Sequence, residues 1–160
     1  MAIRSWQFAV FIFLLVLLHF ILHLALGYGM AAPDLLTIAV LLSARRLTGA
    51  GATVVGFGLG LLQDSLSLVT FGREALTYTV IGFLGTRSRD LFVGDSLLFV
   101  GVYLFIGKWL HDALFWIVSG SQARPPASSA LVMQGPVGAV YCAVVGVAVL
   151  LMYRGISGER

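Results

Sequence analysis

Long apolar stretches separated by short polar loops make up most of this 160-residue sequence. A run of about 18 or more apolar residues can cross a lipid bilayer, and about 20 is typical. Division of the sequence at its polar breaks gives six candidate membrane spans, at about residues 6–26, 34–46, 48–69, 74–86, 91–118 and 131–153. We therefore predict an all-α integral membrane protein whose residues 1–160 form a single domain, a six-helix bundle with two short spans.

Basic residues lie mostly on one side of these predicted spans. Only Arg73 and Arg124 lie in the loops on the other side. Basic residues that flank membrane spans stay in the cytoplasm, so we predict that both chain ends lie inside. The residues that indicate this orientation occupy the chain ends and every second loop, and they are Arg4, Arg45, Arg46, Arg87, Arg89, Arg154 and Arg160.

Composition narrows the class of protein further. Hydrophobic residues make up 59% of the chain and charged residues 11%, and the loops are too short for a soluble domain. The net charge of +3 is explained by the inside loops and does not indicate a nucleic-acid partner. The sequence contains no nucleotide-binding, zinc-protease or nucleophile-elbow motif. We therefore expect neither enzymatic activity nor a cofactor.

The two short spans, 34–46 and 74–86, resemble each other. Each begins next to a charged residue, runs for about a dozen residues and ends near two arginines. Paired short segments mark the binding site in some transporters. Short helices that are shielded by their neighbours, or local thinning of the bilayer, would give the same pattern.

One face of the span 48–69 carries small residues and one acid. Ala52, Gly56, Gly60 and Asp64 are each four residues apart, and this spacing places them on one side of a helix. Small residues let a second helix approach closely, so we expect the glycines to serve in packing. A carboxylate inside a span is costly and normally faces a partner or a cavity.

A second group of ionisable residues lies in the span 91–118. Lys108, His111 and Asp112 share one helix face, because their spacing is i, i+3 and i+4. Asp64 is placed at a similar depth, in the outer half of its span. We predict that Lys108 pairs with Asp64, or with Asp112 in its own helix. A structural ion pair, a partner-binding site and a small-molecule site all stay open.

Two further histidines, His19 and His23, are four residues apart in the outer half of the first span. Together with His111 and the two aspartates they could in principle ligate a metal ion. Their surroundings are mainly Leu and Phe, so we expect hydrogen bonds within the bundle and no metal site. The deeply placed ionisable residues thus lie toward the outer side, and Asp95 alone lies near the inner end of a span. This distribution favours an outward-facing pocket or contact surface over a channel.

At Pro33-Asp34-Leu35-Leu36, and again from Gly56 to Asp64, the chain resembles the MreD family of bacterial rod shape-determining membrane proteins. The resemblance covers about residues 33–91, and the length and the number of spans also fit. It is carried by Pro33-Asp34-Leu35-Leu36, by Gly56-Phe57-Gly58-Leu59-Gly60-Leu61-Leu62-Gln63-Asp64, and by Gly72, Ala75-Leu76, Tyr78, Gly82, Arg87 and Arg89.

This resemblance implies a multi-pass protein of the bacterial cytoplasmic (inner) membrane without enzymatic activity. Its implied partner is MreC, a bitopic protein with a periplasmic domain. The wider machinery would comprise the MreB filament, a SEDS glycosyltransferase and a penicillin-binding transpeptidase. Partner contact or packing would then use the face of Ala52, Gly56 and Gly60 together with Pro33 and Asp34.

The six-span organisation is also similar to the substrate-binding components of energy-coupling-factor transporters. Those proteins bind a small molecule near the outer side of the membrane. They usually carry an Ala-xxx-Ala motif in the first span, where this chain has Ala9 followed by Phe13. The absence of the motif favours the scaffold over the transporter component.

Overall fold

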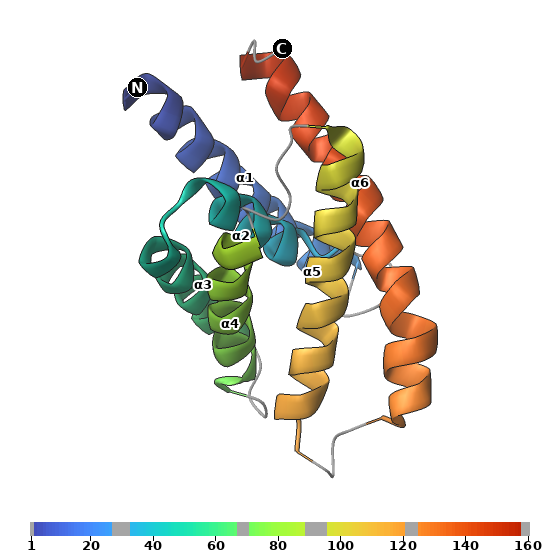
Figure 1. Ribbon diagram of the computed structural model, residues 1–160. Coiled ribbons are helices and arrows are strands. Elements are labelled where there is room, and N and C mark those ends of the chain that lie inside the picture. The colour runs from blue at the N-terminus through green and yellow to red at the C-terminus, as the bar shows by residue number, and fades with distance from the viewer. Residues whose placement is uncertain (1, 27–32, 67–70, 89–95, 121–124, 158–160) are drawn as a thin grey trace.

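A computed structural model describes residues 2–26, 33–66, 71–88, 96–120 and 125–157. Within these ranges all regular secondary structure is helical, which confirms the all-α part of the prediction (Figure 1). A seven-residue π-helical segment, η1 (Ser128–Gln134), leads directly into the last helix. The α-helices are α1 (Ala2–Leu26), α2 (Leu35–Arg46), α3 (Gly49–Asp64), α4 (Arg73–Ser88), α5 (Leu97–Val118) and α6 (Gly135–Ser157).

Among the described residues, three helical stretches are long and apolar enough to cross a membrane. They are Trp6–Ala25, Leu97–Val118 and Ser128–Ile156. In an apolar segment of 18 residues within each stretch, only 11%, 28% and 22% of the residues, respectively, are buried inside the protein. Apolar side chains that point outward from long helices fit a membrane protein, since lipid can cover them.

Three helices, and not two, are short. Helices α2, α3 and α4 have 12, 16 and 16 residues, or about 18 to 24 Å at 1.5 Å per residue. The prediction that the span from residue 48 continues to residue 69 is wrong, because α3 ends at Asp64 and the chain turns directly after it. Residues 67–70 lie outside the described ranges. The end of α3 is fixed here because the Asp64 carboxylate accepts backbone N–H groups from the first turn of α4.

Helix α2 occupies the centre of the bundle. Its ten residues from 35 to 44 are all buried, and it contacts α1, α3, α4, α5 and α6. A helix that is apolar on every side is a buried helix. Shielding by neighbours therefore explains how α2 can be much shorter than a bilayer of about 30 Å.

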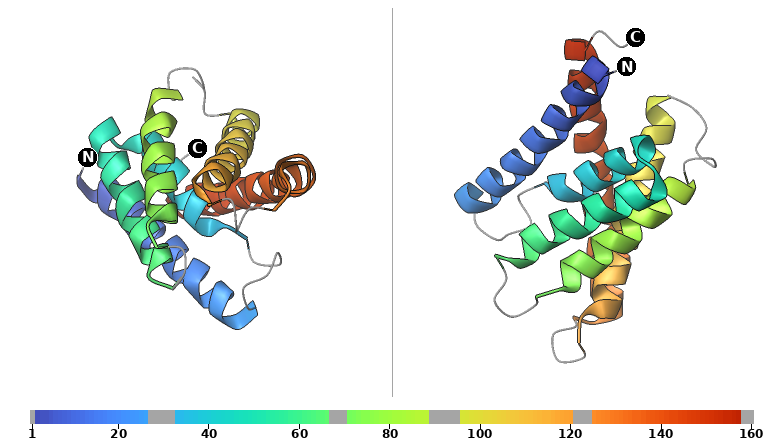
Figure 2. Two further views of the ribbon diagram at one scale, coloured as in Figure 1. Left: turned by 90° about the horizontal axis from the view of Figure 1, so that it is seen from below. Right: turned by 90° about the vertical axis from the view of Figure 1, so that its left-hand side faces the viewer.

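The helices run up and down, so that α1 begins and α6 ends at the same end of the molecule (Figures 1 and 2). We call the half that holds these two helix ends the terminal half, and the other the opposite half. The α3–α4 hairpin lies on one side of α2, and the α5–α6 pair lies on another (Figure 2).

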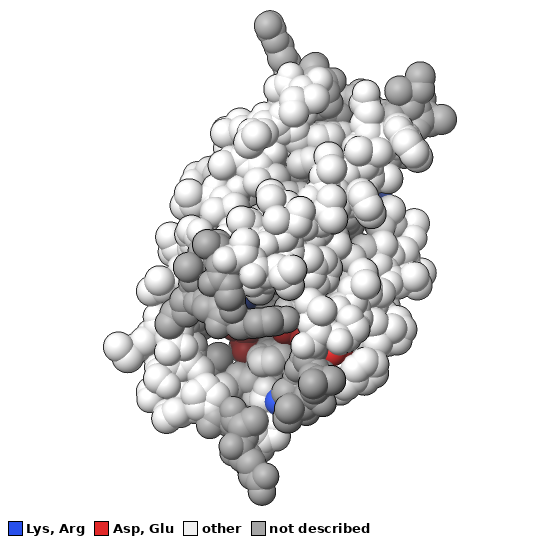
Figure 3. Space-filling model, turned by 180° about the vertical axis from the view of Figure 1, so that it is seen from behind, with Lys and Arg blue, Asp and Glu red and all other residues white. Residues whose placement is uncertain are grey.

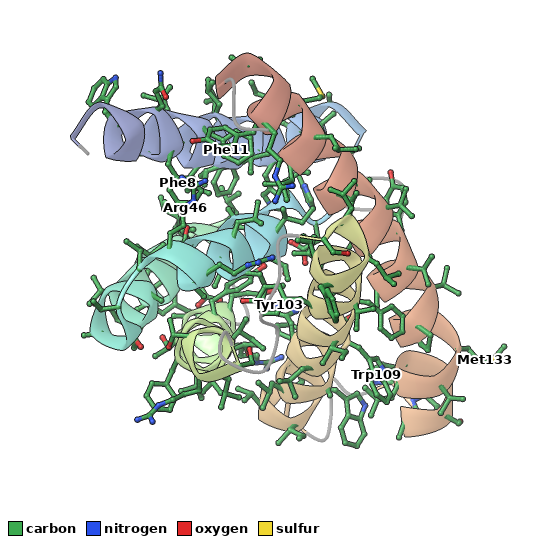
Figure 4. The ribbon with its side chains drawn as sticks, turned by 45° about the horizontal axis from the view of Figure 1, so that its top comes forward. Phe8, Phe11, Arg46, Tyr103, Trp109 and Met133 are labelled. Carbon is green, nitrogen blue, oxygen red and sulfur yellow. The ribbon has the colours of Figure 1, made fainter. Side chains whose placement is uncertain are left out.

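The terminal half contains a cluster around Arg46, at the end of α2. The Arg46 guanidinium carbon lies 4.4 Å from the ring centre of Phe8 and 5.4 Å from that of Tyr153. The Phe11 ring packs at a tilt against Tyr153, with 4.5 Å between ring centres, and Figure 4 shows Phe8, Phe11 and Arg46 between α1 and α2. Arg46 at the end of α2 thus contacts both α1 and α6. This contact lies at the end of the molecule where the sequence places most basic residues.

The small-residue face of α3 packs against α4. A Cβ atom added to Gly56 would overlap the carbonyl group of Tyr78, and one added to Gly60 would overlap the backbone of Ala75. On α4, a Cβ at Gly82 would overlap the carbonyl group of Ala52. The predicted packing role is confirmed. The expectation that this face could receive a partner protein is wrong, because α4 already fills it.

Candidate functional site

Five ionisable side chains from three helices meet in the opposite half. We call them the polar cluster: Asp34 before α2, Glu74 in α4, and Lys108, His111 and Asp112 in α5. Each lies near the start of α2 or α4 or in the second half of α5. The antiparallel order of the helices brings these positions to the same depth.

Lys108 is the centre of the cluster. Its Nζ atom lies 2.7 Å from Oδ2 of Asp34 and 2.7 Å from Oδ1 of Asp112. The side chains of Lys108, Asp34 and Asp112 keep only 13%, 20% and 26% exposure. A charge held this deeply needs close partners of opposite sign, and Lys108 has two.

Asp34 joins three helices through one carboxylate. As the N-cap of α2 it accepts hydrogen bonds from the backbone N–H of Thr37, at 3.0 Å, and from the Thr37 hydroxyl, at 2.6 Å. The hydroxyl of Tyr78 in α4 donates to the same carboxylate at 3.4 Å. Asp at an N-cap satisfies an N–H that the helix leaves unpaired, so here one residue both starts α2 and holds the α5 lysine.

His111 connects α5 to α4. Its Nε2 atom lies 3.1 Å from Oε2 of Glu74, and its Nδ1 atom lies 3.2 Å from Oδ1 of Asp112. The ring is buried against Tyr78, with 4.6 Å between ring centres. An imidazolium has two N–H donors, so this is the form that satisfies both contacts.

The predicted pairing of Asp64 with Lys108 is wrong. Asp64 is fully buried, and its two oxygens accept the backbone N–H groups of Glu74, at 3.2 Å, and Ala75, at 2.9 Å. The first N–H groups of a helix have no partner within it and carry partial positive charge. The carboxylate at the end of α3 therefore caps α4.

The alternative pairing of Lys108 with Asp112 is confirmed. The ion pair between Lys108 and Asp34 was not predicted, because the sequence analysis places Asp34 only in packing or partner contact. A signal was present in the sequence, since Asp34 precedes an apolar run at the same predicted depth as Lys108. Pro33 lies directly before this cap, and its carbonyl accepts the N–H of Leu35 at 2.9 Å.

Replacement of Asp64 by Ala should destabilise the α3–α4 hairpin, because two N–H groups of α4 lose their acceptor. We expect a loss of about 1–2 kcal/mol in the free energy of unfolding, as for other N-caps, with a smaller loss for Asp64→Asn. Unfolding in mixed micelles, followed by circular dichroism, measures this. The control is Ser65→Ala, whose exposed hydroxyl donates only to the carbonyl of Leu62. Wild-type stability of Asp64→Ala would contradict the capping role.

The histidines of α1 form a separate pair. His19 is buried, and its Nε2 atom lies 3.2 Å from Oε1 of Gln63 in α3. Nδ1 of His23 lies 3.1 Å from the carbonyl oxygen of His19. The expected hydrogen bonding within the bundle is confirmed. In the part of the chain that the structure describes, no three His, Cys, Asp or Glu side chains are grouped to hold a metal ion.

An open cavity of about 950 Å³ lies beside the polar cluster. Asp34, Lys108, Asp112 and Arg73 border it, and its other walls are largely apolar and come from α5, η1 and α6. Acidic and basic atoms gather in a hollow in the lower half of the face shown in Figure 3. A mostly apolar cavity with a few convergent charged groups is suited to binding a ligand.

Comparison of the chain with protein-family models, curated proteins and solved structures gives no match. The resemblance to the MreD family therefore rests on the residues that carry it. In the structure several of these residues lie at contacts among α2, α3 and α4, whereas Arg89 lies outside the described residues. Asp34 contacts Tyr78, Gly60 and Asp64 contact Ala75, and Gly82 packs on α3.

Proposed function

We propose that this protein is a non-enzymatic membrane scaffold of the MreD type, which binds MreC and supports the rod shape of a bacterial cell. One observation carries the proposal. Several residues of the resemblance lie at the contacts that hold α2, α3 and α4 together, although they are far apart in the sequence. A shared set of such contacts is what a family with this unit would retain.

The scaffold would lie in the cytoplasmic membrane of the bacterium, with six spans and both chain ends inside. Helices α1, α5 and α6 would cross the full bilayer, and α3 and α4 would sit where it is locally thinned. MreC would bind the outer surface of the bundle, since α4 occupies the groove of α3. MreB, the SEDS glycosyltransferase and the penicillin-binding transpeptidase would join through the assembled complex.

Co-purification with MreC tests this function. The full chain and full-length MreC are expressed together, extracted in mild detergent and isolated by a tag on this chain. We expect MreC to elute with it through gel filtration, and the chain to restore rod shape in cells depleted of MreD. A well-folded chain that retains no MreC and restores no shape would overturn the scaffold function.

Cysteine labelling tests the orientation. The native Cys142 is buried, so it should react little. A cysteine at the exposed Gly120, after α5, should react with an impermeant thiol reagent added to intact cells. A cysteine at the exposed Gly155, near the end of α6, should react only after the cells are opened. The reverse pattern would contradict the predicted direction of the bundle.

A second function, as the small-molecule-binding component of an energy-coupling-factor transporter, is favoured by the cavity beside Lys108. Such a component would co-purify with an ATP-driven coupling module instead of MreC. Isolation of the tagged chain from its native membrane separates the two functions, because the retained partners differ in kind.

A further inference from the structure

Among the described residues that line the cavity, one cation has no ion pair. Arg73, the first residue of α4, lines the cavity. Its side chain forms no ion pair with any residue that the structure describes. Lys108 differs, because two carboxylates already neutralise it. Arg73 is therefore the group in this cavity that can bind an anion, and the planar guanidinium matches the geometry of a phosphate.

Among the described residues, the cavity also presents a carboxylate oxygen that accepts no hydrogen bond. Oδ1 of Asp112 receives both Lys108 and His111. Among the described residues, none donates a hydrogen bond to Oδ2. This oxygen faces Gly138 on α6, since a Cβ added there would lie 4.0 Å from it. Gly138 also lines the cavity, so Oδ2 is placed to accept an N–H from an occupant.

The walls next to these two groups are apolar. Phe115 and Trp116 of α5 line the cavity, and so do Leu131 of η1 and Val137 of α6. An occupant therefore needs an apolar part as well as a polar end. The occupant also needs two charged groups, because an anion can pair with Arg73 and a cationic N–H donor can bind Asp112.

We propose that this cavity binds one phospholipid with a phosphoethanolamine headgroup. The phosphate would pair with Arg73, the ammonium would donate to Oδ2 of Asp112, and acyl chains would lie along the apolar walls. A phosphatidylglycerol offers no ammonium to Asp112, and a phosphatidylcholine has a cation without an N–H donor. This inference does not depend on the scaffold function, because it concerns a cavity that exists whichever partner binds.

Native mass spectrometry of the full chain in detergent micelles tests the inference. The chain is titrated with phosphatidylethanolamine, phosphatidylcholine and phosphatidylglycerol of identical acyl chains. We expect a single tightly held phosphatidylethanolamine, bound about tenfold more tightly than either competitor, which corresponds to one charge-assisted hydrogen bond. Equal binding of all three lipids would overturn the site and leave only annular lipid.

Two variants locate the site. Arg73→Gln removes the unpaired cation without breaking an ion pair to a described residue, and it should weaken phosphatidylethanolamine binding about tenfold. Gly138→Leu should fill the cavity in front of Asp112 while it keeps every charge. The matched control is Gly155→Leu, on the same helix, where an added Cβ meets nothing within 4 Å. Gel filtration and circular dichroism verify that each variant is folded.

The results separate the possible sources of the headgroup. Loss of binding in Gly138→Leu but not in Gly155→Leu supports the cavity. Wild-type binding in both Arg73→Gln and Gly138→Leu overturns it. Soluble phosphoethanolamine is titrated as a third arm. If it binds as tightly as the lipid, the acyl chains contribute nothing, and the assignment of a membrane lipid is wrong.

Discussion

Gly60→Leu should prevent formation of the α3–α4 hairpin. The new side chain would have to occupy the position of the Ala75 backbone. Extra atoms in a packed core cost about 1–3 kcal/mol when side chains can move aside. We expect a larger loss here, because a helix backbone cannot move aside locally. Folded yield after detergent extraction, and unfolding by a denaturing detergent, measure the effect.

The matched control for this substitution lies on the same helix. A Cβ added to Gly58 meets nothing within 4 Å, so Gly58→Leu should fold with near wild-type stability. Gly82→Leu, which inserts the same side chain from the α4 side against Ala52, should behave like Gly60→Leu. If Gly58 and Gly60 tolerate leucine equally well, α3 and α4 do not pack through this face.

Lys108→Met should be the most damaging change in the polar cluster. It leaves Asp34 and Asp112 buried without their shared cation. Removal of one partner from a buried ion pair costs about 3–5 kcal/mol, whereas neutral replacement of all partners can be nearly free of cost. We therefore expect a strong loss of folded protein in Lys108→Met, measured as the gel-filtration monomer yield. The triple variant, which combines Lys108→Met with Asp34→Asn and Asp112→Asn, should recover much of the lost monomer yield.

The recovered triple variant distinguishes a structural cluster from a functional one. If it folds, binds MreC and restores rod shape, the cluster serves only to hold α2 and α5 together. If it folds but does neither, the charges themselves take part in function. Arg87→Gln, near the end of α4 in the terminal half, is the control for the loss of an unrelated charge. Full stability of Lys108→Met alone would contradict the burial argument.

Asp64 and Lys108 show how far sequence reasoning reaches in this protein. Their depth was predictable, because residue number along a helix gives height at 1.5 Å per residue. Their partners were not, since rotation of one helix about its axis against another depends on packing. Asp64 points to α4 and Lys108 points to α2. Two residues at the same height thus face different neighbours.

Local patterns in the sequence by themselves determined the all-helical class, the close-packing face of Gly56 and Gly60, and the shared depth of Asp64 and Lys108. The reason is that helix period, residue size and hydropathy act over a few turns of one segment. Only the tertiary structure decided that α2 is the buried centre, that Asp34 is the partner of Lys108, and that a cavity lies beside them. These features arise where helices that are distant in sequence meet. Which side chains contact one another there depends on how the helices pack.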